Sequence, residues 1–249
     1  MALQEEMEKQ GNFLFKYRGY LPLIIVAIGL AVFIEPYLNV IDIFALKYST
    51  IQFIGLFISL IGLFIRAYAV GHTPANTSGR NTKEQLADEL NTTGIYSTVR
   101  HPLYLGNFFM WLGAAILINN GWFVVAFILL YWIYYERIMF AEEQFLRRKF
   151  GSAYTDWADK TPAFIPNFGK YIPSKYPFSW KKVLKKEKNG LLAVFVLLFV
   201  FHNINYSFQT GHISIDLNWI AWGTFAAGIL YLVLKFLKKK TSILNETGR

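Results

Sequence analysis

The chain has no cysteine and few histidines, and these absences exclude several kinds of chemistry. Without cysteine there can be no disulfide, no thiolate metal site and no cysteine nucleophile. The four histidines are scattered between His72 and His212 and lack the spacing of metal ligands. We therefore expect neither a bound metal nor thiol catalysis.

Charged residues are also scarce, at 16% of the 249 positions, whereas apolar residues make up 54%. The apolar residues form long blocks, and the mean hydropathy is positive. Blocks of this length predict an all-α, polytopic membrane bundle with about six transmembrane helices. We expect these helices near residues 20–40, 50–70, 103–118, 122–135, 191–206 and 217–237.

The third and fourth blocks are separated only by Asn119, Asn120 and Gly121. Asn-Gly favours left-handed backbone geometry, so the two blocks predict a tight helical hairpin. After the fourth block an apolar face continues while charge appears on the opposite face, as far as Phe150. This helix should therefore leave the membrane and end at Gly151.

The basic residues are distributed unevenly between the two sides of such a bundle. With a cytoplasmic N-terminus, all but two of the 25 lysines and arginines fall in cytoplasmic segments, the exceptions being Lys47 and Arg66. The positive-inside rule then predicts that both termini and the polar loop at residues 71–99 are cytoplasmic. Within that loop, residues 81–90 suit a short interfacial helix.

The net charge of +9 raises the question of which anionic partner the chain meets. The basic residues flank apolar blocks, which favours anionic lipid head groups and argues against nucleic acid. Arg66 should snorkel toward the interface; the alternative is that it pairs with an acid. The densest basic run, which we expect on the lipid surface, is Lys181, Lys182, Lys185, Lys186 and Lys188.

Arg100 and His101 stand immediately before the third apolar block, and Pro102 suits the first turn of a helix. They form either a membrane rim of snorkelling charges or a functional site at the lipid boundary. Because the predicted hairpin is antiparallel, His101 and Glu142 should lie at the same membrane depth. These residues predict a cytoplasmic-facing pocket for charged groups attached to lipids, and they specify no reaction.

Two spaced motifs and a closing segment extend this prediction by resemblance. They are Gly94-x-Tyr96-x-x-x-Arg100-His101-Pro102-x-Tyr104-x-Gly106, Glu142-Glu143-x-x-Leu146-x-x-x-Phe150-Gly151-x-x-Tyr154, and Thr161-Pro162-Ala-Phe-Ile-Pro166. Together they resemble the isoprenylcysteine carboxyl methyltransferase family, and the phospholipid N-methyltransferases share parts of the pattern. The resemblance covers about two-fifths of the chain, from Arg66 to Pro166.

The resemblance implies that S-adenosyl-L-methionine binds on the cytoplasmic side, beside the loop before Arg100. Glu142 would face the cationic end of this cofactor, and Arg137 is the best counterpart of the family's substrate-orienting arginine. Arg100 would suit an anionic ligand, and Glu143 is a candidate base. The implied cofactor contacts are Tyr96, His101, Pro102, Leu103, Tyr104, Glu142, Asn81, Asp88, Glu89, Leu90 and Asn91.

The implied activity is methyl transfer to a membrane lipid or lipid-modified acceptor through a carboxylate, a phosphate or an amine. An ionised oxygen needs no base, whereas an amine must lose a proton, for which His101 or Glu143 would serve. One alternative is a sterol-type reductase that uses NADPH. Another is a membrane scaffold or transporter, although the sequence has few charges in the middle of its blocks.

The same reasoning divides the chain into three parts. Residues 1–70 would hold the first two transmembrane helices, and residues 71–168 the methyltransferase core. Residues 169–249 would supply a basic linker and two further transmembrane helices, which the motifs do not include.

Overall fold

A computed structural model describes residues 2–34, 47–75, 77 and 85–248. Within these ranges the chain forms helices and contains no β-strand. The α-helices are α1 (Leu3–Tyr17), α2 (Leu21–Ile34), α3 (Tyr48–Gly71), α4 (Pro102–Ile116), α5 (Gly121–Phe150), α6 (Ser152–Ala158), α7 (Trp180–Thr210) and α8 (Trp219–Lys240); the 3-10 turns are η1 (Ile95–Ser97) and η2 (Phe168–Lys170). The predicted all-α class is confirmed for this part of the chain.

Four of the described helices, α3, α5, α7 and α8, are long and apolar enough to cross a membrane. The apolar helices α2 and α4 are shorter, with 14 and 15 residues. A span of the hydrocarbon core takes about 20 residues, so length alone does not qualify them. The chain is thus a helical membrane protein, and the count of six spans stays a prediction.

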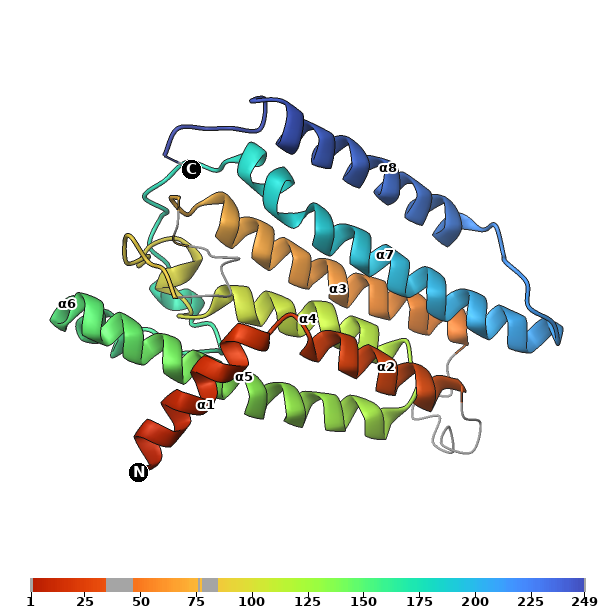
Figure 1. Cartoon of the computed structure of the whole chain (residues 1–249), viewed down its shortest axis with the longest axis horizontal. Helices are drawn as coiled ribbons and strands as arrows, with labels where there is room; N and C mark the ends of the chain where they lie inside the picture. Colours follow the sequence, from red (N-terminus) through yellow and green to blue (C-terminus); the bar gives the residue numbers. More distant parts are fainter. Residues whose placement is uncertain (1, 35–46, 76, 78–84, 249) are drawn as a thin grey trace.

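The long helices lie side by side in one tilted row, and α1 crosses α5 at an angle (Figure 1). The closest neighbours are α3 with α4, α1 with α5, and α7 with α8. Both termini and the start of α4 lie at the same end of the bundle (Figure 1). The site described below is built at this end.

The pairing of α3 with α4 depends on glycines that face each other. A Cβ atom on Gly113 would collide with the Ser59 side chain and the Gly55 carbonyl oxygen, and one on Gly62 would collide with the Gly106 carbonyl oxygen. Small residues allow helix backbones in lipid to approach closely, where van der Waals contact replaces the missing hydrophobic driving force. These small residues therefore set the close contact between α3 and α4.

The predicted hairpin turn forms, but its left-handed residue is Asn119 rather than the Asn120-Gly121 pair. Asn119 adopts a φ of 56°, and the Asn120 side chain accepts a hydrogen bond from the Phe123 N–H at 2.9 Å. This cap starts α5, which continues unbroken to Phe150. Gly151, with a φ of 56°, ends it by donating its N–H to the Arg147 carbonyl.

Helix α7 differs from the prediction, because it begins at Trp180 rather than near residue 191. The basic run is therefore helical, and two of its lysines face the protein interior. Lys182 is 5% exposed and its ammonium donates to the Thr73 carbonyl, the Thr73 hydroxyl and the Pro74 carbonyl, at 2.6, 3.0 and 2.8 Å. Lys188, also buried, donates to the Lys185 carbonyl. Placing Lys182 and Lys188 on the lipid surface was wrong, because backbone carbonyls take the place of the lipid phosphates.

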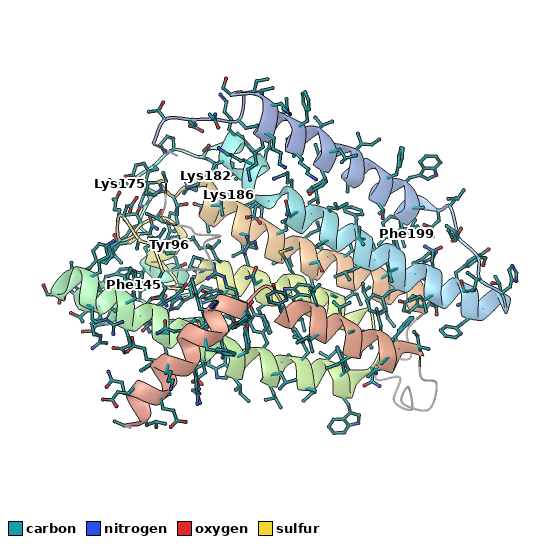
Figure 2. The ribbon with its side chains drawn as sticks, in the orientation of Figure 1. Tyr96, Phe145, Lys175, Lys182, Lys186 and Phe199 are labelled. Carbon is teal, nitrogen blue, oxygen red and sulfur yellow. The ribbon has the colours of Figure 1, made fainter. Side chains whose placement is uncertain are left out.

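Lys182 joins α7 to the segment that follows α3, at the same end of the bundle as Tyr96 (Figure 2). Replacing Lys182 with Met should remove the ammonium donor from three oxygens, which costs about 2 kcal/mol or more of folding stability. We expect the unfolding midpoint in detergent to fall by about 5 °C. The exposed Lys181→Met is the matched control; equal melting of the two variants would contradict this role for Lys182.

Candidate active site

A cavity of about 410 Å³ lies at the end of the bundle that carries both termini. Its walls come from α1, α3, α4, α5, α6, α7 and the loop before α4. Leu103, Asn107 and Trp111 line it at a spacing of four residues, which places them on one face of α4. At a rise of 1.5 Å per residue, Trp111 lies about 12 Å further along the helix than Leu103. The cavity thus extends from a polar rim toward the apolar middle of the bundle.

The start of α4 is fixed by a segment that returns to it from α6. Gly94, with a φ of 62°, allows the chain to turn into η1. The N–H groups of Arg100 and His101 then donate to the carbonyls of Pro162 and Ala163, at 2.9 and 3.2 Å. The Arg-His-Pro motif is therefore held by the Thr161–Pro166 stretch, and both belong to the sequence pattern that suggested the family.

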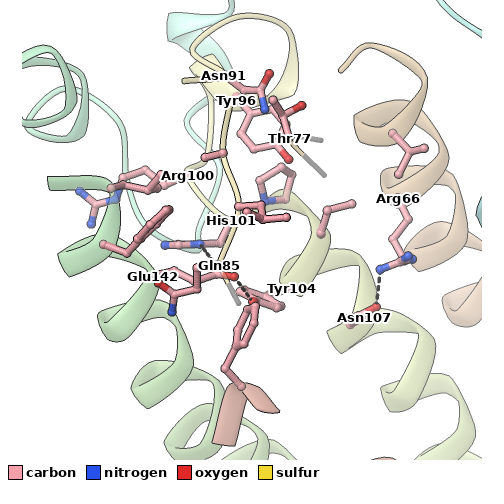
Figure 3. Close-up of a pocket in the computed structure, with 18 of the residues that line it drawn as sticks. Arg66, Thr77, Gln85, Asn91, Tyr96, Arg100, His101, Tyr104, Asn107 and Glu142 are labelled. Atoms are coloured by element: carbon pink, nitrogen blue, oxygen red, sulfur yellow. Dashed lines mark hydrogen bonds and ion pairs between the residues drawn. The ribbon is translucent and has the colours of Figure 1, made fainter. Parts of the chain in front are cut away.

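The hairpin brings His101 and Glu142 together, as the antiparallel arrangement requires. Tyr104 donates its hydroxyl to one Glu142 oxygen at 2.7 Å, and His101 Nδ1 lies 3.8 Å from the other oxygen (Figure 3). Arg18, the C-cap of α1, lies 4.0 Å from the same carboxylate and stacks on the Phe15 ring. The Glu142 side chain is 26% exposed, so a negative group stays accessible in the cavity wall.

Glu143 contacts the other nitrogen of the His101 ring and also pairs with Arg100. Its Oε1 lies 2.9 Å from His101 Nε2 and 3.0 Å from Arg100 Nε. Arg100 also donates to the Ala158 carbonyl at 2.9 Å. Glu143 therefore fixes the orientation of the His101 ring and anchors Arg100 to the end of α6.

Arg66 does not snorkel to the interface. Its Nε and Nη2 donate to the two oxygens of Glu187 on α7, both at 2.8 Å, and its Nη1 donates to Asn107 Oδ1 at 2.7 Å. The favoured interpretation from sequence was wrong, and the alternative of a paired arginine holds. Pairing replaces snorkelling because a fork of two charge-assisted hydrogen bonds compensates for the lost hydration.

Most of the residues expected at the site do line the cavity. These are Tyr96, Arg100, His101, Pro102, Leu103, Tyr104, Glu142, Glu89, Leu90 and Asn91. Asp88, Glu143 and Arg137 are not among its lining residues, and the Arg137 guanidinium is paired with Glu136 at 3.2 Å. Asn81 lies outside the described residues, and residues 85–90 of the expected interfacial helix are not helical.

The structure adds lining residues that the sequence analysis did not assign to the site: Phe15, Arg18, Arg66, Asn107, Trp111, Lys186 and Glu187. Two of these residues could have been found from the sequence. Arg66 is an ionisable residue inside an apolar block, and Glu187 is the only acid in a run of lysines. No sequence pattern places Arg18 at the site, because its position depends on how α1 packs against α5.

Two loop residues show how charge is distributed around the cavity. Burial raises the pKa of Tyr96; the charge of Glu142 raises this pKa further, and that of Arg66 lowers it. The fields of Glu142 and Arg66 thus both reach the Tyr96 hydroxyl. Hydrogen bonds from Lys175 and Tyr176 lower the pKa of Glu89, so this carboxylate is ionised at neutral pH.

The segment that builds most of the cavity is similar in sequence to known methyltransferases. Residues 50–153 match the family model described as phospholipid methyltransferase. A probable protein-S-isoprenylcysteine O-methyltransferase of Oryza sativa subsp. indica is 32% identical over 127 residues, which cover 48% of this chain and 63% of the relative. Over this methyltransferase-like core, the chain is similar to the isoprenylcysteine methyltransferases. The resemblance that the motifs indicated is confirmed over this part of the chain.

Further relatives of this methyltransferase-like core carry the same description. The protein-S-isoprenylcysteine O-methyltransferase of Saccharomyces cerevisiae is 30% identical over 45% of this chain and 48% of its own length. The one of Schizosaccharomyces pombe is 32% identical over 48% of this chain and 51% of its own length. The matched region thus spans less than two thirds of each of these relatives. No solved structure matches the chain significantly.

Proposed function

We propose that the protein is an integral membrane methyltransferase that uses S-adenosyl-L-methionine on a lipid or lipid-modified acceptor at the cytoplasmic face. The observation that carries the proposal is Glu142, an accessible carboxylate held by Tyr104 inside the methyltransferase-like core. The relatives are named as methyltransferases, which favours this activity over the reductase alternative. The cavity volume lies within the range of about 300–1,000 Å³ that is usual for small-molecule sites.

The residues around the cavity suit the proposed cofactor. Glu142 would face its cationic groups, and Tyr104 would keep the carboxylate in place. Asn91 and Tyr96 would contact the rest of the cofactor from the loop. Asp88, Arg137 and Glu143 contribute no cavity wall, so their proposed roles would have to be indirect. His101, rather than Glu143, is then the base available to an amine acceptor.

The bound cofactor would supply a methyl group already activated by its sulfonium, so that the acceptor's electron pair forms the new bond while the S–CH3 pair returns to sulfur. The chain's own residues must then align the acceptor with that bond and exclude water. Aromatic and aliphatic side chains along α4 and α5, such as Trp111 and Tyr135, would exclude water in the deeper part of the cavity.

The cytoplasmic placement rests on the distribution of charge. The termini, the loop before α4 and the basic start of α7 lie at the same end of the bundle as the cavity (Figures 1 and 2). The positive-inside rule assigns such an end to the cytoplasm. We propose that the remaining exposed basic side chains, such as Lys181, contact anionic head groups there.

The names of the relatives indicate which acceptor to test first, namely an S-isoprenylated cysteine with a free carboxylate. We expect the purified protein in detergent to bind S-adenosyl-L-methionine in calorimetry. Proteoliposomes with methyl-labelled cofactor should transfer label to N-acetyl-S-farnesylcysteine as a base-labile ester. A protein that neither binds the cofactor nor transfers label to the prenylcysteine or to membrane lipids would refute the proposed function.

A further inference from the structure

Glu187 reaches the cavity from a helix outside the family-matched segment. It lies on α7, whereas the match covers residues 50–153. Its side chain is only 6% exposed, and both of its oxygens accept hydrogen bonds from Arg66. Asn107 on α4 holds the third guanidinium donor (Figure 3). Three helices therefore cooperate to fix one arginine in the cavity wall.

Attachment of α7 to α3 does not by itself explain this pair. The helices also meet where Gly190 packs against Leu63, and where Gln52 hydrogen-bonds His202 at 2.8 Å. A buried ion pair seldom adds net stability over apolar packing, because removing two charges from water is costly. An ionisable group inside a membrane helix more often marks a ligand or its path.

The way Arg66 is held leaves it able to bind a further anion. A guanidinium has five N–H donors, and Glu187 and Asn107 together use three of them. Arg66, Glu187 and Asn107 all line the cavity, and so does Lys186. Glu187 balances the charge of Arg66, so the net charge of +1 in this part of the wall comes from Lys186, and Arg66 contributes two oriented N–H donors.

The cavity thus has two walls of opposite character. Glu142 provides a carboxylate on the α5 side, and Arg66 provides a cation on the α3 side (Figure 3). The fields of both reach Tyr96. A cationic cofactor would meet Glu142 and an anionic acceptor would meet Arg66, and Tyr96 lines the same cavity.

We propose that Arg66 binds an anionic oxygen of the methyl acceptor and that Glu187 is the positioning residue that orients it. The inference rests on the proposed methyltransferase function and narrows its acceptor to an oxyanion, the chemistry shared by a carboxylate and a phosphate. One acceptor oxygen would stay hydrogen-bonded to Arg66 while the other attacks the sulfonium methyl group. A lone pair of the attacking oxygen forms the O–CH3 bond, the electron pair of the broken S–CH3 bond goes to sulfur, and no proton moves. Helix α7, which follows the family-matched segment, is therefore part of the acceptor site.

The test compares Glu187→Gln, Arg66→Gln and the double variant Arg66→Gln/Glu187→Gln in proteoliposomes. Probes are N-acetyl-S-farnesylcysteine, its methyl ester, phosphatidic acid and phosphatidylethanolamine. The double variant leaves no uncompensated buried charge, so it should fold where a single variant may not. Asp156→Asn, an exposed acid on α6, is the control for removing a carboxylate.

We expect Arg66→Gln and the double variant to raise the KM for the anionic acceptor by about 10-fold or more, the loss typical of a charged hydrogen bond. The Kd for S-adenosyl-L-methionine and the inhibition constant of the neutral methyl ester should change less than about 2-fold. Glu187→Gln should raise the same KM, and Glu187→Asp should restore it in part. A purely structural pair would instead alter melting and cofactor binding, and leave the KM unchanged.

Three results would overturn the inference. The first is a double variant with the wild-type KM for the acid, and the second is a wild-type protein that methylates only phosphatidylethanolamine. In both, methyl transfer by the wild type would leave the proposed function intact. The third is a wild-type protein that neither binds the cofactor nor transfers label, which removes the inference and the proposed function together. Label on farnesylcysteine or on phosphatidic acid identifies which oxyanion is the acceptor.

Discussion

Glu142→Gln should weaken binding of S-adenosyl-L-methionine by about 30-fold or more, since truncating one partner of a buried charge pair costs about 2–5 kcal/mol. The glutamine keeps the shape of the side chain and can still accept the Tyr104 hydrogen bond. What it loses is the negative charge that would face the cofactor's cationic groups. Calorimetry on the purified protein measures the change directly.

Asp156→Asn is the control for Glu142→Gln, because it removes an exposed carboxylate that does not line the cavity. Tyr104→Phe should show a smaller loss, because Glu142 keeps its charge and loses only the donor that holds it. A Glu142→Gln protein with the affinity of Asp156→Asn would show that the cationic groups of the cofactor do not contact this carboxylate.

Gly113→Leu should prevent formation of the folded protein. The added side chain would collide with the Ser59 hydroxyl and the Gly55 carbonyl oxygen, and the latter is backbone that cannot rotate away. The cost therefore exceeds the range of about 1–3 kcal/mol usual for overpacking. Because α3 and α4 carry Arg66 and His101, the site should be lost with the helix pair. Size-exclusion chromatography in detergent should show little monodisperse protein.

Gly228→Leu is the matched control, since a Cβ atom at Gly228 on α8 meets nothing within 4 Å. It adds the same side chain to another apolar helix, so it should behave like the unmodified protein. Equal yields and melting of the two leucine variants would contradict the close contact between α3 and α4.

By itself, the sequence determined the features that depend on local patterns. The apolar blocks predicted the helical membrane class, Asn119 to Gly121 predicted the hairpin, and Gly151 predicted the end of α5. Each of these depends on side chains close in sequence, and the structure agrees with all three. The spacing of the motifs also indicated the resemblance that the comparisons find over the core of the chain. The roles assigned to single residues from that family, Arg137 among them, stay predictions.

Only the tertiary structure decided which helix faces meet. Arg66 and Glu187 are 121 positions apart, and the burial of Lys182 follows from a helix that begins earlier than its apolar block. Lipid tails are as apolar as a leucine side chain, so hydropathy in a membrane helix does not mark the face that packs. The positions of α1 and α7, and with them Arg18 and Glu187 in the cavity wall, therefore followed from packing that no local pattern encodes.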